Sequence, residues 1–110
     1  MPYLVIKSWY PTNLISETTK KYLEVVQKYP PATIAAIGET LVPVASKTTK
    51  KGVKTMSIYE VTEGKLEEAL TLASNAMAMF NDFEGYEYSI ETWATVSEAL
   101  AVQGIKAPER

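Results

Sequence analysis

The alternation of apolar and polar positions divides the chain into segments with either a strand period or a helix period. Four segments are rich in β-branched and aromatic residues and are typical of strands; they are 3–10, 33–46, 53–61 and 86–95. Three segments carry apolar residues at helical spacing with polar residues between them; they are 15–29, 65–81 and the short 97–102.

Prolines and glycines set the expected limits of these elements. Pro30 and Pro31 end the first helix because proline cannot continue an α-helix. Pro43 forbids a central position for the second strand and predicts an edge strand, while Gly38 predicts a bulge or bend. The polar segment 47–52 predicts a hairpin tip.

The order of these elements is β-α-β-β-α-β, which predicts an α+β, ferredoxin-like fold with a four-stranded antiparallel sheet. Right-handed crossovers place both long helices on one face and give the strand order 4-1-3-2. At 110 residues the chain has room for one core. We therefore expect a single domain over 1–104 and a C-terminal tail over 105–110.

The second face of this sheet has no helix to cover it, so its composition is informative. We expect six side chains to point toward the helices: Leu4, Ile6, Met56, Ile58, Tyr88 and Ile90. The open face then receives the other strand residues: Tyr3, Val5, Lys7, Trp9, Thr55, Ser57, Tyr59, Glu87, Ser89, Glu91 and Trp93. Because this face is too aromatic for water and too charged for an ordinary sandwich core, we expect a homodimer that encloses it.

Two short motifs and the order of the elements are similar to those of a known group of proteins. The Tyr29-Pro30-Pro31 ending of the first helix and the Gly85-Tyr86-Glu87-Tyr88 entry to the last strand resemble the dimeric α+β barrel superfamily. Within it, the chain is most similar to small uncharacterised prokaryotic and archaeal domains. The resemblance implies a dimer; the superfamily includes cofactor-independent monooxygenases, lactone isomerases and haem-dependent enzymes, many of which use histidine.

Composition narrows the chemistry further. The chain has no cysteine and no histidine, which excludes disulfides, Cys/His zinc sites, His- or Cys-ligated haem and Ser-His-Asp catalysis. We expect no cofactor and no metal. The acidic net charge of −2 argues against nucleic-acid binding by the chain as a whole. Lys and Glu dominate the charged residues, which is a tendency of hyperthermophile proteins.

Two groups on the expected open face are candidate sites. Lys7, Glu87 and Glu91 lie on neighbouring strands and, with Tyr59, are candidates for acid–base catalysis in a dry interior; the alternative is an interface ion pair. A second group is aromatic and comprises Trp9, Tyr59 and Trp93. It is a candidate pocket for an apolar or aromatic ligand, with dimer packing as the alternative.

The remaining charged positions favour structural explanations over functional ones. Lys47, Lys50, Lys51 and Lys54 cluster at the hairpin, but the stacking aromatics of RNA-recognition domains are absent there, so a solvated tip is the favoured interpretation. Glu39 is typical of an edge-strand charge that discourages aggregation.

No run of 18 apolar residues is present, and the apolar run 3–6 is too short for a signal peptide, so we expect a cytoplasmic protein. Three functions stay open. The first is binding of a small apolar or aromatic molecule between the sheets of a homodimer. The alternatives are a cofactor-independent enzyme on the open face and a nucleic-acid or regulatory interaction module.

Overall fold

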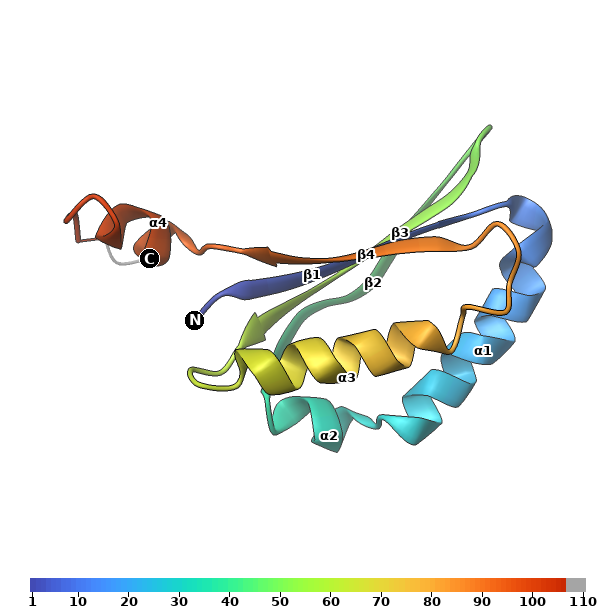
Figure 1. Cartoon of the computed structure of the whole chain (residues 1–110). Helices are drawn as coiled ribbons and strands as arrows, with labels where there is room; N and C mark the ends of the chain where they lie inside the picture. Colours follow the sequence, from blue (N-terminus) through green and yellow to red (C-terminus); the bar gives the residue numbers. More distant parts are fainter. Residues whose placement is uncertain (107–110) are drawn as a thin grey trace.

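The chain forms one four-stranded antiparallel sheet with three helices on one of its faces (Figure 1). A computed structural model describes residues 1–106. The strands are β1 (Tyr3–Tyr10), β2 (Gly38–Thr49), β3 (Gly52–Val61) and β4 (Glu87–Trp93). The helices are η1 (Thr12–Leu14), α1 (Ile15–Lys28), α2 (Pro31–Ala35), α3 (Leu66–Ala78) and α4 (Val96–Ala101). The strand order β2-β3-β1-β4 confirms the predicted ferredoxin-like fold.

The start of the second strand differs from the sequence prediction. Residues 33–37, expected to be extended, belong to α2 and the turn after it, and β2 begins only at Gly38. The reason is the Pro30-Pro31 pair. Pro30 is extended and serves as the N-cap, and Pro31 occupies the first helical position, where an N–H would have no partner in any case.

The prediction that β2 is an edge strand is confirmed. Its pairing with β3 shifts register twice, between Thr40 and Val42 and between Val42 and Ala45, so the irregular stretch contains Pro43 and not Gly38. Gly38 has a different role: a Cβ built there would lie 2.6 Å from the Glu60 carbonyl oxygen. Glycine is therefore required by close backbone approach, and the predicted bulge lies further along the strand.

The register of β3 corrects the prediction of which side chains face the helices. In an antiparallel pair, partner residues share a face. Leu4 pairs with Tyr59 and Ser8 with Thr55, which turns the odd-numbered residues of β3 toward the helices. Met56 and Ile58 therefore lie on the open face, contrary to expectation. Val53 and Val61, at the two ends of β3, are the buried residues that favour this register.

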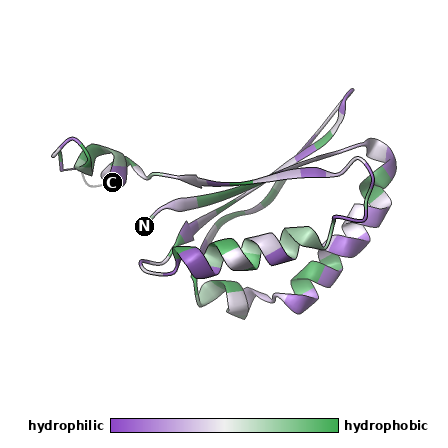
Figure 2. Cartoon of the chain, viewed as in Figure 1, coloured by the Kyte–Doolittle hydropathy of each residue, from purple (hydrophilic) through white to green (hydrophobic). Residues whose placement is uncertain are grey.

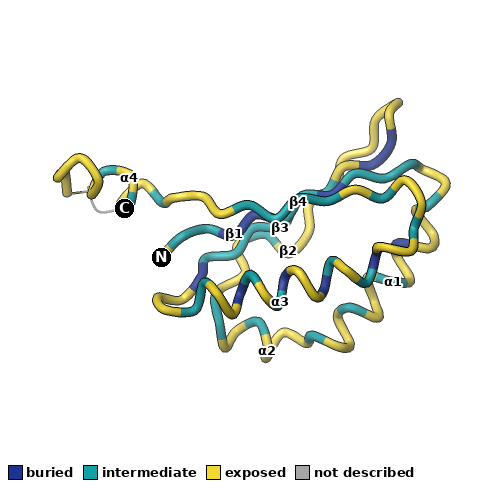
Figure 3. Tube along the Cα trace, in the orientation of Figure 1, coloured by how far each residue is buried: buried dark blue, intermediate teal, exposed yellow. Residues whose placement is uncertain are grey.

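A cluster of buried core residues lies between the sheet and α3 (Figure 3). It consists of Leu4 and Val61 from the sheet and Ala69 and Ala73 from α3. Small alanines allow α3 to approach the sheet closely. In contrast, α1 buries only Thr18, although its apolar and polar residues alternate around the helix as Figure 2 shows. The helix layer therefore leaves space beside α1.

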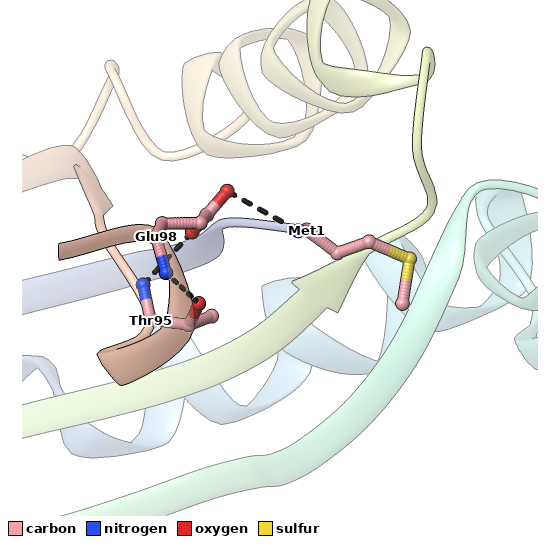
Figure 4. Close-up of polar contacts among 3 residues, drawn as sticks. All are labelled: Met1, Thr95 and Glu98. Carbon is pink, nitrogen blue, oxygen red and sulfur yellow. Dashed lines mark hydrogen bonds and ion pairs between the residues drawn. The ribbon is translucent and has the colours of Figure 1, made fainter. Parts of the chain in front are cut away.

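The last helix extends beyond the sheet, away from the other three (Figure 1). Thr95 and Glu98 form a reciprocal capping box at its start, and the N-terminal amine lies 3.2 Å from the Glu98 carboxylate (Figure 4). The Thr95 backbone N–H, followed by the N-terminal amine, lowers the pKa of Glu98. Of the predicted tail 105–110, residues 107–110 lie outside the described residues, and the domain limit at Gly104 stays a prediction. Within 1–106, no helix has the length and apolar character to cross a membrane.

We expect Gly52→Ala to destabilise the fold more than Gly64→Ala. Both glycines have positive φ, +124° and +80°, which costs a non-glycine residue about 1–3 kcal/mol. At Gly52 a Cβ would also lie 2.5 Å from the Tyr10 carbonyl oxygen, whereas at Gly64 nothing lies within 4 Å. Urea unfolding monitored by circular dichroism measures both losses. Equal losses at the two positions would contradict the role of backbone contact at Gly52.

Candidate functional site

A cavity of about 620 Å³ lies between the sheet and the helices. Its walls come from the helix-facing side of β1, β2 and β3, from the inner sides of α1 and α3, and from α2. Among the residues that the structure describes, those that line the cavity include no Asp, Glu, Lys or Arg. The site is therefore suited to an uncharged molecule, because a buried charge would find no opposite charge there.

Hydroxyl groups cover much of the sheet side of the cavity. Ser46, Thr55 and Ser8 lie side by side across β2, β3 and β1, and the Ser8 and Thr55 hydroxyls form a hydrogen bond. Ser57 and Tyr59 follow along β3. These are short or polar side chains at positions where a sheet facing helices usually carries large apolar residues. They leave space and offer neutral hydrogen-bond groups within it.

An aromatic stack closes one end of the cavity. The Tyr86 ring lies between Tyr10, at 5.4 Å between ring centroids, and Phe80, at 4.7 Å, and both pairs are nearly parallel. Burial raises the pKa of Tyr86, so its phenol stays protonated at neutral pH. This end therefore presents flat, uncharged surfaces against which another ring can pack.

The cavity has a mouth between α1 and β2. Tyr22 and Val26 from α1 and Val44 from β2 line it, and these three large apolar side chains remain 36–44 % exposed. Apolar side chains that are both exposed and directed to a cavity are a common feature of ligand entrances. The mouth gives the cavity access to solvent.

The opposite side of the sheet is the open face, and the register gives its arrangement. Four rows cross it in the strand order β2, β3, β1, β4. Read across the sheet, they are Lys47-Lys54-Trp9-Glu87, Ala45-Met56-Lys7-Ser89, Val42-Ile58-Val5-Glu91 and Glu39-Glu60-Tyr3-Trp93. The two middle rows are mainly apolar and the end rows are charged and aromatic. No helix among residues 1–106 covers this face (Figure 1).

The structure brings together part of the predicted acid–base group. Lys7 Nζ lies 3.4 Å from Glu91 Oε1, the Trp93 indole N–H donates to the same oxygen at 2.8 Å, and Ser89 donates to Oε2 at 2.9 Å. The Trp93 bond, then those of Ser89 and Lys7, lower the pKa of Glu91. A carboxylate stabilised in its charged form is a weak proton acceptor, so this geometry favours a structural ion pair over catalysis.

The other predicted partners are separated. Tyr59 faces the helices and lines the cavity, on the opposite side of the sheet from Lys7, because the β3 register differs from the expected one. Glu87 lies opposite Trp9 and has no ion pair within residues 1–106. A catalytic group of Lys7, Tyr59, Glu87 and Glu91 is therefore not assembled within one subunit.

The predicted aromatic pocket is not assembled either. Trp9 and Trp93 lie at opposite ends of the open face, about 20 Å apart along the strands, and Tyr59 lies beneath it. Only Tyr59 lines the cavity, where burial raises its pKa. Its role in binding a ligand, like the roles of Trp9 and Trp93, stays a prediction.

Ser8, Tyr22 and Tyr86 were not predicted to line a cavity, and Ser57 was assigned to the open face, so the sequence analysis missed the cavity role of all four. The available signal was a strand sequence with hydroxyls at alternating positions between two buried valines, Val53 and Val61. The lysine cluster is also divided. Lys47 and Lys54 lie opposite each other on the open face, while Lys50 and Lys51 form the turn.

No family model and no curated protein sequence matches the chain. A solved structure does: a dimeric ferredoxin-like protein from an uncultured marine organism, with a TM-score of 0.52 and 11 % sequence identity. The match covers 87 % of this chain and 97 % of that one. It establishes the ferredoxin-like fold.

We expect Trp93→Phe to raise the pKa of Glu91 toward the ordinary value of a glutamate, because the substitution removes the strongest hydrogen bond to its carboxylate. The lowered pKa contributes stability above the ordinary pKa, and this is lost as the pH falls through the folded-state value. A carboxyl NMR titration measures the shift. Trp9→Phe, which leaves Glu91 without a changed contact, is the control; equal shifts in both variants would contradict the assignment.

Proposed function

We propose that the protein binds a small, uncharged, mainly apolar molecule in the cavity between its helices and its sheet. The observation that carries this proposal is a hollow of about 620 Å³ whose described lining is apolar and hydroxyl-bearing without a charged side chain. That volume lies in the range of small-molecule sites, which combine apolar walls with a few polar groups. The aromatic stack of Tyr10, Tyr86 and Phe80 favours a ligand with a planar ring.

The proposed site replaces the location expected from the sequence, which was between the sheets of two subunits. The cavity belongs to one chain and lies on the helix side of the sheet. Binding is favoured over catalysis because the one ion pair near the predicted site, Lys7–Glu91, is on the far side of the sheet from the cavity. Burial raises the pKa of Tyr59 and of Tyr86, so these two phenols stay protonated at neutral pH.

The second part of the proposal is a homodimer that covers the open face. Val5, Met56 and Ile58 form an apolar centre on this face, with Val5 buried and Met56 and Ile58 half-buried within the chain, and Trp9 and Trp93 lie toward its ends. Such a surface on one side of a sheet is typical of an interface. The solved structure of similar fold is that of a dimeric ferredoxin-like protein, which supports a dimer here.

We expect an uncharged probe, N-phenyl-1-naphthylamine, to increase in fluorescence on binding, and Ser57→Leu to weaken its binding at least about tenfold by filling the cavity. Added apolar volume in an unfilled site should leave thermal stability unchanged or higher. Ser74→Leu, the same change at an exposed position of α3 outside the cavity lining, should have no effect. Equal binding by all three proteins would contradict the site.

We expect Ile58→Asp to make the protein monomeric in sedimentation velocity, because a carboxylate at the apolar centre of the open face would be buried without a partner. Leu23→Asp is the matched control, since Leu23 is 57 % exposed on α1 and does not line the cavity. A wild-type protein that sediments as a monomer at all accessible concentrations would overturn the dimer.

A further inference from the structure

Two pairs of like charges face each other across the β2–β3 hairpin on the open face. Lys47 lies opposite Lys54 near the tip, and Glu39 lies opposite Glu60 at the other end. Like charges at directly opposed cross-strand positions destabilise a sheet. Within residues 1–106, none of these four side chains forms an ion pair with another part of the chain. The isolated subunit thus carries two unfavourable pairs at defined positions.

The residues between the two pairs are apolar. Ala45 lies opposite Met56 in one row and Val42 opposite Ile58 in the next. Glu60 lies six positions after Lys54 on β3, which corresponds to about 20 Å along the strand. Read along the strands, this half of the face is positive, apolar and then negative.

This order of charges is complementary to the same order read in the opposite strand direction. Consider a second copy that lies face to face with the first. The two copies are related by a two-fold axis that lies in the interface and runs perpendicular to the strands. The negative end of the second copy then lies over the positive end of the first. The apolar middles then meet, with Met56 against Ile58 of the second copy. In the same arrangement Trp9 lies over Tyr3 of the second copy, so these two aromatic side chains also meet.

We propose that the partner on the open face is a second copy of this chain in this orientation, with Lys47 and Lys54 of each subunit paired to Glu39 and Glu60 of the other. The inference rests on the dimer proposed above and specifies its geometry. Packed sheets lie about 10 Å apart, a distance that lysine and glutamate side chains together can span. Lys54 is exposed, and its Nζ lies over the Trp9 ring, 5.7 Å from the ring centroid, so its charge is already on the open face.

The alternative two-fold axis, parallel to the strands, pairs Lys47 with Glu87 of the second copy and leaves the other three charges of the hairpin without a partner of opposite sign. It places β2 over β4 and β3 over β1 of the second copy, so that Lys54 lies against Trp9 and Glu60 against Tyr3. Val42 would then face Glu91, an apolar group against a carboxylate that is already engaged by Lys7. The Glu39 and Glu60 charges would remain opposed to each other without a partner of opposite sign.

A charge exchange tests the orientation. We expect Lys54→Glu and Glu60→Lys each to weaken the dimer about tenfold at low salt, because each replaces two symmetry-related attractions by repulsions. The double variant Lys54→Glu/Glu60→Lys should restore the wild-type dissociation constant, since the exchanged charges pair again across the axis. Sedimentation velocity over a concentration series measures all four proteins.

Two control variants carry the same changes in net charge at exposed positions outside the four rows of the open face. They are Lys51→Glu for the first variant and Glu63→Lys for the second. They should leave the dissociation constant unchanged. Rescue in the double variant supports the proposed axis. A stable dimer without weakening in the single variants, or without rescue in the double variant, overturns the orientation and leaves the dimer standing. A wild-type protein that never dimerises overturns both.

Discussion

The pairing of β3 with β1 determines what each side of the sheet can do. Because Leu4 lies opposite Tyr59 and Ser8 opposite Thr55, one alternating set of β3 residues lines the cavity and the other lies on the open face. A shift of one residue would place Met56 and Ile58 under the helices, fill the hollow with apolar side chains and leave hydroxyls on the outer surface. Both proposals, for the ligand and for the partner, depend on this single register.

The element order was readable from the sequence because proline, glycine and apolar spacing are local signals. Tyr3–Tyr10 and the edge position of the Pro43 strand follow directly from them. The orientation of β3 was not readable, since both of its alternating sets contain large apolar residues. Val53 and Val61 are in one set, and Met56 and Ile58 are in the other. A strand with apolar residues on both sides has an ambiguous hydrophobic pattern, and only its long-range pairing decides.

The candidate site was predictable only in part for the same reason. Lys7 and Glu91 meet because both were assigned to the open face and because β1 pairs with β4 as the fold requires. Tyr59 was assigned to that group through the wrong β3 orientation. The cavity itself was out of reach of the sequence, since it arises where α1 stands away from the sheet while the alanines of α3 allow close contact. No local pattern in α1 encodes that separation.

The cavity and the open face lie on opposite sides of one layer of strands. In a two-fold assembly joined through the open faces, the two cavities therefore lie on the outer flanks, with both sheets between them. Each mouth, at Tyr22, Val26 and Val44, then opens to solvent on its own subunit. In the proposed assembly the entrances would be unobstructed, and a ligand would reach each subunit without crossing the shared interior.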